Sequence, residues 1–132
     1  MQKAEQRFAE LHATMGRPLL LHGDLHHGNI LSAAREPWLA IDPKGVIGEA
    51  EYGVIPFLMN HLPEQPEVRI RRRIERFAER MELDARRIAA WAFCHAVLSA
   101  WWCVEDEAGC EQSAIRLAVL FDQLLNEYGY LT

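Results

Sequence analysis

Long hydrophobic runs and cysteine are both scarce in this sequence. No uninterrupted apolar stretch in its 132 residues approaches the ~18–20 residues that a membrane-spanning helix requires, and the start has no signal-peptide pattern. The cysteines are Cys94, Cys103 and Cys110, an odd number without metal-ligand spacing. Because Cys94 and Cys103 fall on one expected helix, we expect free buried thiols rather than disulfides. These absences predict a cytoplasmic protein with no membrane contact.

A surplus of positive charge is also missing, since the net charge is −5. Nucleic-acid binding depends on basic surface, so we expect no nucleic-acid partner. An acidic surface favours a cationic ligand instead. The candidate residues for such a surface, which fit a merely solvated helix end equally well, are Glu105, Asp106, Glu107 and Glu111.

Half of the residues are hydrophobic and a quarter are charged, which is typical of a folded globular chain. One segment is strongly basic. Its apolar residues Ile70, Ile74 and Phe77 recur at helical spacing, so we expect its arginines to form an exposed helix face. These arginines are Arg69, Arg71, Arg72, Arg73 and Arg76.

The most informative segment is His22–Leu31, which reads His-Gly-Asp-Leu-His-His-Gly-Asn-Ile-Leu. Its His-x-Asp-x-x-x-x-Asn spacing is that of a kinase catalytic loop, with Gly23 in place of the usual arginine. Asp24 is the candidate base for an attacking hydroxyl. Asn29 and Asp42 offer oxygen ligands of the kind that Mg²⁺ prefers. The pattern predicts phosphoryl transfer from a magnesium-bound nucleotide.

Apolar runs beside this loop favour strands. Leu19–Leu21 leads into the loop, and Trp38–Ile41 leads to Asp42. The alternative is a hairpin whose polar residues only supply turn chemistry. A zinc site is disfavoured, because Gly23 and Gly28 interrupt the helix that would align three nearby histidines. These histidines are His22, His26 and His27.

In the segment His22–Leu31 and in several later segments, the sequence resembles the aminoglycoside/hydroxyurea antibiotic resistance kinases. These are the streptomycin 6-kinase-like branch of the aminoglycoside phosphotransferases. The loop motif by itself is shared by many kinase-like enzymes. The narrower resemblance comes from the turn Asp42-Pro43-Lys44-Gly45, from Gly48-Glu49, and from the later segments Ala90–Phe93 and Leu98–Trp102. The resemblance covers nearly the whole chain.

The resemblance implies an α+β fold, mostly α-helical: the C-terminal lobe of a protein-kinase-like fold, with a small β-hairpin carrying the catalytic loop. It implies phosphoryl transfer from ATP, with Mg²⁺, to a hydroxyl of an aminoglycoside such as streptomycin. Asp24 would be the catalytic base, and His22 would hold the loop together. Asn29 and Asp42 would bind the metal and, through it, the nucleotide. One departure is Gly53, where the family often carries an acidic residue that braces the loop.

A chain of this length suits one domain, residues 1–132. A complete kinase also needs a lobe that covers the phosphates with a glycine-rich loop and anchors them with a strand lysine. The sequence has no Gly-x-Gly-x-x-Gly, and its only lysines are Lys3 and Lys44. We therefore expect a C-terminal lobe without its nucleotide lobe, weakly active or inactive alone. A homodimer through the uncovered surface is also expected.

Helical periodicity organises the remaining sequence. Helices are expected before Gly16, over about 50–61 with a break at Gly53 or Pro56, over 66–81, over 85–104 after an Asp84 cap, and around 114–125. Trp91 and Phe93 are expected in the core, whereas Trp101 or Trp102 is a candidate for the substrate site.

Two functional hypotheses from different classes follow. In the first, the chain is the catalytic-loop lobe of an antibiotic phosphotransferase. In the second, it is a non-catalytic binding or scaffold domain that keeps kinase-like loops. A strand-rich coding segment upstream of Met1, with an anchoring lysine, would favour the first hypothesis.

Overall fold

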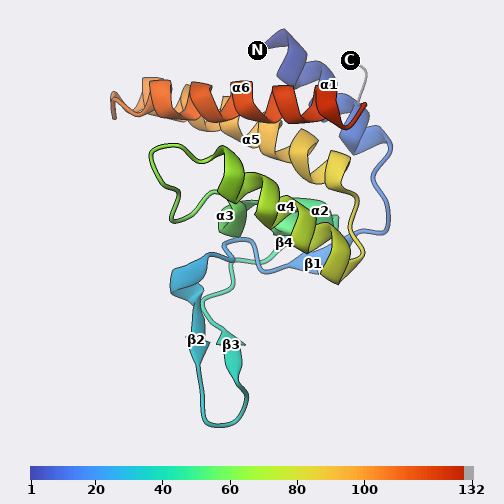
Figure 1. Cartoon of the computed structure of the whole chain (residues 1–132), viewed down its shortest axis with the longest axis vertical. Coiled ribbons are helices and arrows are strands. Elements are labelled where there is room, and N and C mark those ends of the chain that lie inside the picture. The colour runs from blue at the N-terminus through green and yellow to red at the C-terminus, as the bar shows by residue number, and fades with distance from the viewer. Residues whose placement is uncertain (130–132) are drawn as a thin grey trace. The chain divides into compact units, whose positions relative to one another are not determined.

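The computed structural model describes residues 1–129, which are mostly helical with two small antiparallel sheets (Figure 1). This composition agrees with the α+β class expected from the sequence. The contacts divide the chain into two compact units. The helical unit contains Met1–Thr14 and the chain from Asp84 onward, and the mixed unit is Met15–Leu83. A single domain over the whole chain stays a prediction.

The helical unit consists of α1 (Gln2–Ala13), α5 (Ala85–Glu105) and α6 (Glu111–Glu127). Helices α5 and α6 run side by side, and α1 packs against α5 (Figure 1). Asp84 begins α5 as predicted, because its Oδ1 accepts hydrogen bonds from the backbone N–H groups of Arg86 and Arg87. Apolar side chains from all three helices form the core of this unit, including Leu11, Ile88, Trp91, Phe93, Phe121, Leu124 and Leu125.

Helix α5 is apolar along its whole length but is buried mainly in its first half. Trp91 and Phe93 lie in the core, as predicted, whereas Trp101 and Trp102 are each 48% exposed. Among residues 1–129, α5 is the one helix long and apolar enough to cross a membrane by length and composition. The core helix of a soluble protein meets the same criteria, so this is weak evidence for a membrane span.

A buried arginine sits inside the helical unit. Arg7 is only 1% exposed, and its Nη2 lies 2.7 Å from Oδ1 of Asp122. Its guanidinium carbon also stands 4.5 Å from the ring centroid of Phe93. Pairing with a carboxylate and an aromatic face is what makes a buried guanidinium tolerable.

The mixed unit carries both sheets. Strand β1 (Leu19–Leu21) pairs antiparallel with β4 (Val46–Gly48), with Leu20 opposite Ile47. Strand β2 (Ile30–Ser32) pairs antiparallel with β3 (Trp38–Ala40), with Leu31 opposite Leu39. The β1 and β3 strands confirm the sequence prediction, and β2 is an additional strand. The strand at Val46–Gly48 was not expected from the sequence; its pairing with β1 satisfies backbone groups of both segments.

Three helices complete the mixed unit: α2 (Ala50–Gly53), α3 (Ile55–Leu58) and α4 (Glu67–Met81). The expected break in the 50–61 segment occurs at Val54, and Pro56 lies in the first turn of α3, where its missing N–H costs no hydrogen bond. Pro66 is the residue before α4 rather than its first residue, and Glu82, which follows the end of α4 at Met81, has a positive φ of 54°.

Arg73 of α4 closes the end of α3. Its Nη1 donates hydrogen bonds to the backbone carbonyls of Phe57, Leu58 and Asn60. These are carbonyls at and beyond the C-terminus of a helix, which have no partner within it. Burial, and then the charge of Arg69, lowers the pKa of Arg73. The basic segment is therefore not only an exposed face: Arg69, Arg72 and Arg76 are exposed, but Arg73 is half-buried and structural.

The expectation of three free cysteines was wrong for two of them. Cys103, near the end of α5, and Cys110, which precedes α6, form a disulfide with a Cα–Cα distance of 5.4 Å. The turn between the helices reverses the chain and returns Cys110 to Cys103, a proximity that helical periodicity does not reveal. Cys94 is free, as predicted, and burial raises its pKa to about 11.

Candidate functional site

The kinase-like loop connects β1 to β2 in the mixed unit. It ends in a short 3₁₀ turn, His27–Asn29, which runs directly into β2. His26 caps this turn, since its Nδ1 accepts a hydrogen bond of 3.0 Å from the backbone N–H of Gly28. The local sequence thus bends the chain between Asp24 and Asn29 and brings their side chains to the same side of the loop.

His22 ties the loop to the segment that follows β3. Its Nδ1 accepts a hydrogen bond from the backbone N–H of Asp24 at 3.2 Å. Its Nε2 therefore carries the ring proton, which it donates to the backbone carbonyl of Ile41 at 2.6 Å. The backbone carbonyl of His22 accepts from the N–H groups of Lys44 and Gly45 at 2.7 and 3.1 Å. One residue therefore joins the 22–29 loop to the 41–45 segment.

Asn29 is a buried amide that holds Asp24. Its Nδ2 donates to the backbone carbonyl of Asp24 at 2.9 Å and lies 3.5 Å from Oδ2 of the same residue. It also lies 3.2 Å from Nε2 of His26. With Nδ2 turned toward Asp24, the Oδ1 atom is the part of the amide that could bind a cation.

Lys44 forms an ion pair with Asp24 that the sequence did not lead us to expect. Its Nζ lies 3.2 Å from Asp24 Oδ2, and His26 Nε2 lies 3.7 Å from the same oxygen. The hydrogen bond from Lys44 is the largest cause of a lowered pKa for Asp24. The one signal in the sequence was the position of Lys44, two residues after Asp42 in the Asp-Pro-Lys-Gly turn.

Asp42 follows Ile41 directly and has an exposed side chain and a positive φ of 53°. Aspartate tolerates this left-handed conformation better than most residues. The backbone N–H of Ile41 donates to the carbonyl of Asn29 at 2.8 Å, so Asp42 lies one residue beyond a direct link to Asn29. Asp24 and Asn29 are thus in contact, and Asp42 is linked to them through the main chain. Whether the three side chains share one cation stays a prediction.

Glu49 is a further buried polar residue that sequence reasoning missed. It is 4% exposed, and its Oε2 accepts a hydrogen bond of 3.1 Å from the backbone N–H of Gly16. At Gly53, where the resemblance led us to expect an acidic residue, a Cβ atom would lie 3.3 Å from Cδ2 of Leu21. Leu21 therefore packs tightly against the position where the expected carboxylate would begin.

The three clustered histidines have different partners, which disfavours zinc. His22 bonds to Ile41, His26 lies beside Asn29, and the ring of His27 stacks on Phe57 with centroids 4.0 Å apart. Among residues 1–129, no group of three or more histidine, cysteine, aspartate or glutamate side chains is arranged to hold a metal ion. A carboxylate–amide oxygen set remains the chemistry that this site offers, and it suits Mg²⁺.

The acidic residues that are candidates for binding a cationic ligand lie in the helical unit. Glu105 ends α5, and Asp106 and Glu107 follow it in the turn closed by the Cys103–Cys110 disulfide. All three acidic side chains are exposed. Trp102 stands edge-on to His95, with ring centroids 6.4 Å apart. Their part in substrate binding stays a prediction.

Comparison with known proteins identifies relatives of this chain. The family model for "Aminoglycoside/hydroxyurea antibiotic resistance kinase" matches residues 4–107. A streptomycin 6-kinase of Streptomyces glaucescens is 38% identical over 105 residues, which are 75% of this chain and 34% of that protein. A hydroxyurea phosphotransferase of Kitasatospora aureofaciens is 39% identical over 87 residues, 66% of this chain and 25% of that protein.

A streptomycin 3''-kinase of Klebsiella pneumoniae is 35% identical over 107 residues, 75% of this chain and 40% of that protein. The chain therefore spans about a third of the length of these curated relatives. No solved structure matches it significantly. The family match includes the 22–29 loop, the 41–45 segment and helix α5. The chain belongs to the aminoglycoside/hydroxyurea antibiotic resistance kinase family.

Proposed function

We propose that this chain is the catalytic-loop lobe of a phosphotransferase that transfers a phosphoryl group from ATP to a hydroxyl of a streptomycin-like aminoglycoside. The observation that carries the proposal is the network around Asp24, in which His22, Asn29 and Lys44 each contact Asp24. The names of three relatives, two acting on streptomycin and one on hydroxyurea, support an antibiotic as the acceptor.

Asp24 is the proposed base. Its lowered pKa keeps the carboxylate ionised at neutral pH, so that it can accept a hydrogen bond from the acceptor hydroxyl. Asn29 holds the backbone carbonyl of Asp24, and His22 holds its backbone N–H. A carboxylate fixed at both backbone groups is aligned before the substrate arrives, which is how positioning lowers a phosphoryl-transfer barrier.

Asn29 and Asp42 are the proposed magnesium ligands, through Oδ1 and a carboxylate oxygen. The donor set fits, because Mg²⁺ is held by one or two carboxylates with other oxygens and substrate phosphates. When bound, Mg²⁺ neutralises charge on the ATP phosphates. Lys44 places a cation beside the carboxylate of Asp24, within reach of the region where negative charge would develop.

The acidic residues Glu105, Asp106 and Glu107, with Trp102, are proposed to attract the cationic acceptor. We place the protein in the cytoplasm because ATP is available there and not because of its cysteines, since a disulfide such as Cys103–Cys110 is rare in that compartment. We propose no nucleic-acid or membrane partner. The complete enzyme needs a nucleotide lobe in addition to the residues present here. A homodimer is the proposed state of the chain on its own.

The test is transfer of the γ-phosphate of ATP to streptomycin by the purified chain and by Asp24→Asn. The proposal expects little or no turnover by the chain alone, and restored turnover when the lobe is joined to a nucleotide lobe from a relative. In that joined protein, Asp24→Asn should abolish transfer. Activity unaffected by this substitution would refute the assignment of the base.

A second candidate function is a non-catalytic binding or scaffold domain. The observation that favours it is the ion pair between Lys44 and Asp24, because a base already paired with a lysine is a weaker proton acceptor. A joined protein that binds ATP and streptomycin but never transfers phosphate would support this candidate.

A further inference from the structure

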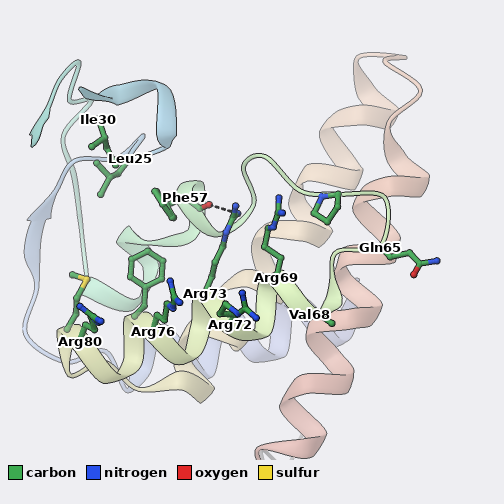
Figure 2. A pocket seen from close by; sticks show the side chains of 13 residues that line it. Leu25, Ile30, Phe57, Gln65, Val68, Arg69, Arg72, Arg73, Arg76 and Arg80 are labelled. Atoms are coloured by element: carbon green, nitrogen blue, oxygen red, sulfur yellow. Dashed lines mark hydrogen bonds between the residues drawn. The ribbon is translucent and has the colours of Figure 1, made fainter. Parts of the chain in front are cut away.

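A basic groove runs along one side of α4 in the mixed unit. Its volume is about 650 Å³. Figure 2 shows Leu25 and Ile30 at one end, Phe57 on α3, and a row of arginine side chains along α4. We call it the arginine groove and define its basic side by Arg69, Arg72, Arg73, Arg76 and Arg80.

Two of these arginines are already committed to backbone carbonyls. Arg73 donates to the end of α3, and Nη1 of Arg69 donates to the carbonyl of His61 at 2.9 Å. The other three, Arg72, Arg76 and Arg80, are exposed and form no ion pair within the part of the chain that the structure describes. The groove therefore offers three guanidinium groups without an anionic partner.

These three arginines repel one another. Arg72, Arg76 and Arg80 are spaced by four residues, so they lie on one face of α4, and like charges at this spacing destabilise a helix. The helix contains six arginines and three glutamates, in a chain whose overall net charge is −5. An anion bound in the groove would remove the repulsion and form charge-assisted hydrogen bonds with the guanidinium groups.

The groove also has an apolar lining, which we call its apolar wall. Leu25 and Ile30 contribute to it from the loop and β2, Phe57 from α3, and Phe77 and Met81 from α4 itself. An inorganic ion would leave these side chains facing water, whereas a ligand with an aromatic or aliphatic body would cover them. The volume is within the range of about 300–1,000 Å³ that is typical of small-molecule sites.

We propose that the arginine groove binds a small amphipathic anion: an aromatic or aliphatic body against the apolar wall, with a carboxylate, phosphate or sulfonate held by Arg72 and Arg76. A polycationic acceptor such as an aminoglycoside would be repelled by the same arginines. The groove is thus a second site, and its existence does not depend on the proposed phosphotransferase activity.

The probe for this site is 1-anilinonaphthalene-8-sulfonate, an aromatic anion whose fluorescence rises on transfer to an apolar surface. Its neutral counterpart, N-phenyl-1-naphthylamine, has the same aromatic rings without the sulfonate. The full chain is titrated with each probe. The variants are Arg72→Gln/Arg76→Gln, Arg72→Lys/Arg76→Lys, and a matched control of two exposed arginines in the helical unit, Arg86→Gln/Arg116→Gln.

The glutamine pair in the groove should weaken binding of the sulfonate about tenfold, the cost of losing charged hydrogen bonds. Binding of the neutral probe should stay unchanged, and the lysine pair should retain most of the sulfonate affinity. The control pair should behave as the unchanged chain does. Circular dichroism and the midpoint of urea unfolding establish that each variant is folded.

Three results would overturn the proposal. The first is equal sulfonate affinity in the unchanged chain and in Arg72→Gln/Arg76→Gln. The second is a parallel loss of the neutral probe, which would mean that the substitutions only damaged the apolar wall. The third is displacement of the sulfonate by polyglutamate or single-stranded DNA at lower concentrations than by octyl phosphate or octanoate, which would identify a macromolecular acidic partner instead.

Discussion

The ammonium nitrogen of Lys44 lies 3.2 Å from Oδ2 of Asp24, although the two residues are separated by a loop, a hairpin and a turn. Backbone hydrogen bonds from Lys44 and Gly45 to the carbonyl of His22 bring the segments together. The side-chain ion pair is thus a consequence of how the main chain is joined. It gives the candidate base, Asp24, a cationic neighbour that lowers its pKa.

Replacing Lys44 by methionine should raise the pKa of Asp24 toward its ordinary value of 3.8. The native pKa is lowered, so this ion pair stabilises the fold above the unfolded pKa and loses its effect as the pH falls through the folded one. Lys44→Met should therefore lose less stability on acidification than the unchanged chain. NMR titration of the Asp24 carboxyl carbon measures the shift directly.

The only other lysine provides the matched control. Nζ of Lys3 lies 2.9 Å from Oδ1 of Asp122 in the helical unit. Burial by itself would raise the pKa of Asp122, but the hydrogen bonds and charges of Lys3 and Arg7 outweigh burial, so the pKa is lowered overall. Lys3→Met should move the pKa of Asp122 upward and leave that of Asp24 unchanged. A shift of Asp24 in Lys3→Met would contradict the local origin of the effect.

Removing the ring of His22 should loosen the candidate site. His22→Ala leaves the backbone carbonyl of Ile41 and the backbone N–H of Asp24 without their partner. We expect a loss of about 1–3 kcal/mol in the free energy of unfolding, the cost of unsatisfied polar groups in a partly buried site. Urea unfolding gives the value, and amide hydrogen exchange at Lys44 and Gly45 should accelerate in the variant.

His12→Ala is the control for that measurement, because His12 is exposed on α1, where its ring stacks on Phe8. Its effect should stay within about 0.5 kcal/mol. Equal losses in the two variants would show that His22 has no special role in joining the loop to the 41–45 segment.

Truncating Arg73 should destabilise the mixed unit more than truncating its neighbour Arg72. Arg73→Ala removes the donor for three carbonyls at the end of α3, and we expect a loss of about 2–3 kcal/mol. Arg72→Ala removes an exposed side chain without an ion pair, so its effect should be within about 0.5 kcal/mol. Urea unfolding of both variants tests this difference, and a larger loss in Arg72→Ala would overturn it.

Opening the disulfide should destabilise the turn between α5 and α6. Closing the short loop from Cys103 to Cys110 contributes about 2 kcal/mol by the loop-entropy relation. Cys103→Ala/Cys110→Ala should lower the free energy of unfolding by that amount, with Cys94→Ala as the comparison. Alkylation of the denatured, unreduced chain should label one cysteine, and three labels would show that the disulfide does not form.

Periodicity in the sequence predicted the four longer helices well, because each has an apolar stripe or a clear cap, but not the bounds of the short helices α2 and α3. The Asp84 cap, the buried positions Trp91 and Phe93, and the end of α4 near Met81 all follow from residues close together in the chain. The strands β1 and β3 were predicted for the same reason, since short apolar runs lead to polar loop residues.

Pairings between distant segments could not be predicted in this way. Val46 and Ile47 favour a strand, but a run of three residues does not reveal that its partner is β1. Cys110 meets Cys103 only after the chain reverses. The use of Arg73 as a cap for α3 likewise depends on where two helices cross, and no local pattern reports it.

The types of residue in the 22–29 loop and the 41–45 segment were determined by the sequence alone: two carboxylates, an amide, a histidine and a lysine in a spacing typical of kinases. Tertiary structure alone decided which of them touch, because hydrogen bonds from Ile41, Lys44 and Gly45 to the earlier loop draw together groups that are far apart along the chain. The same holds for the arginine groove, where helical spacing placed the charges on one face and only the fold brought Leu25, Ile30 and Phe57 to them.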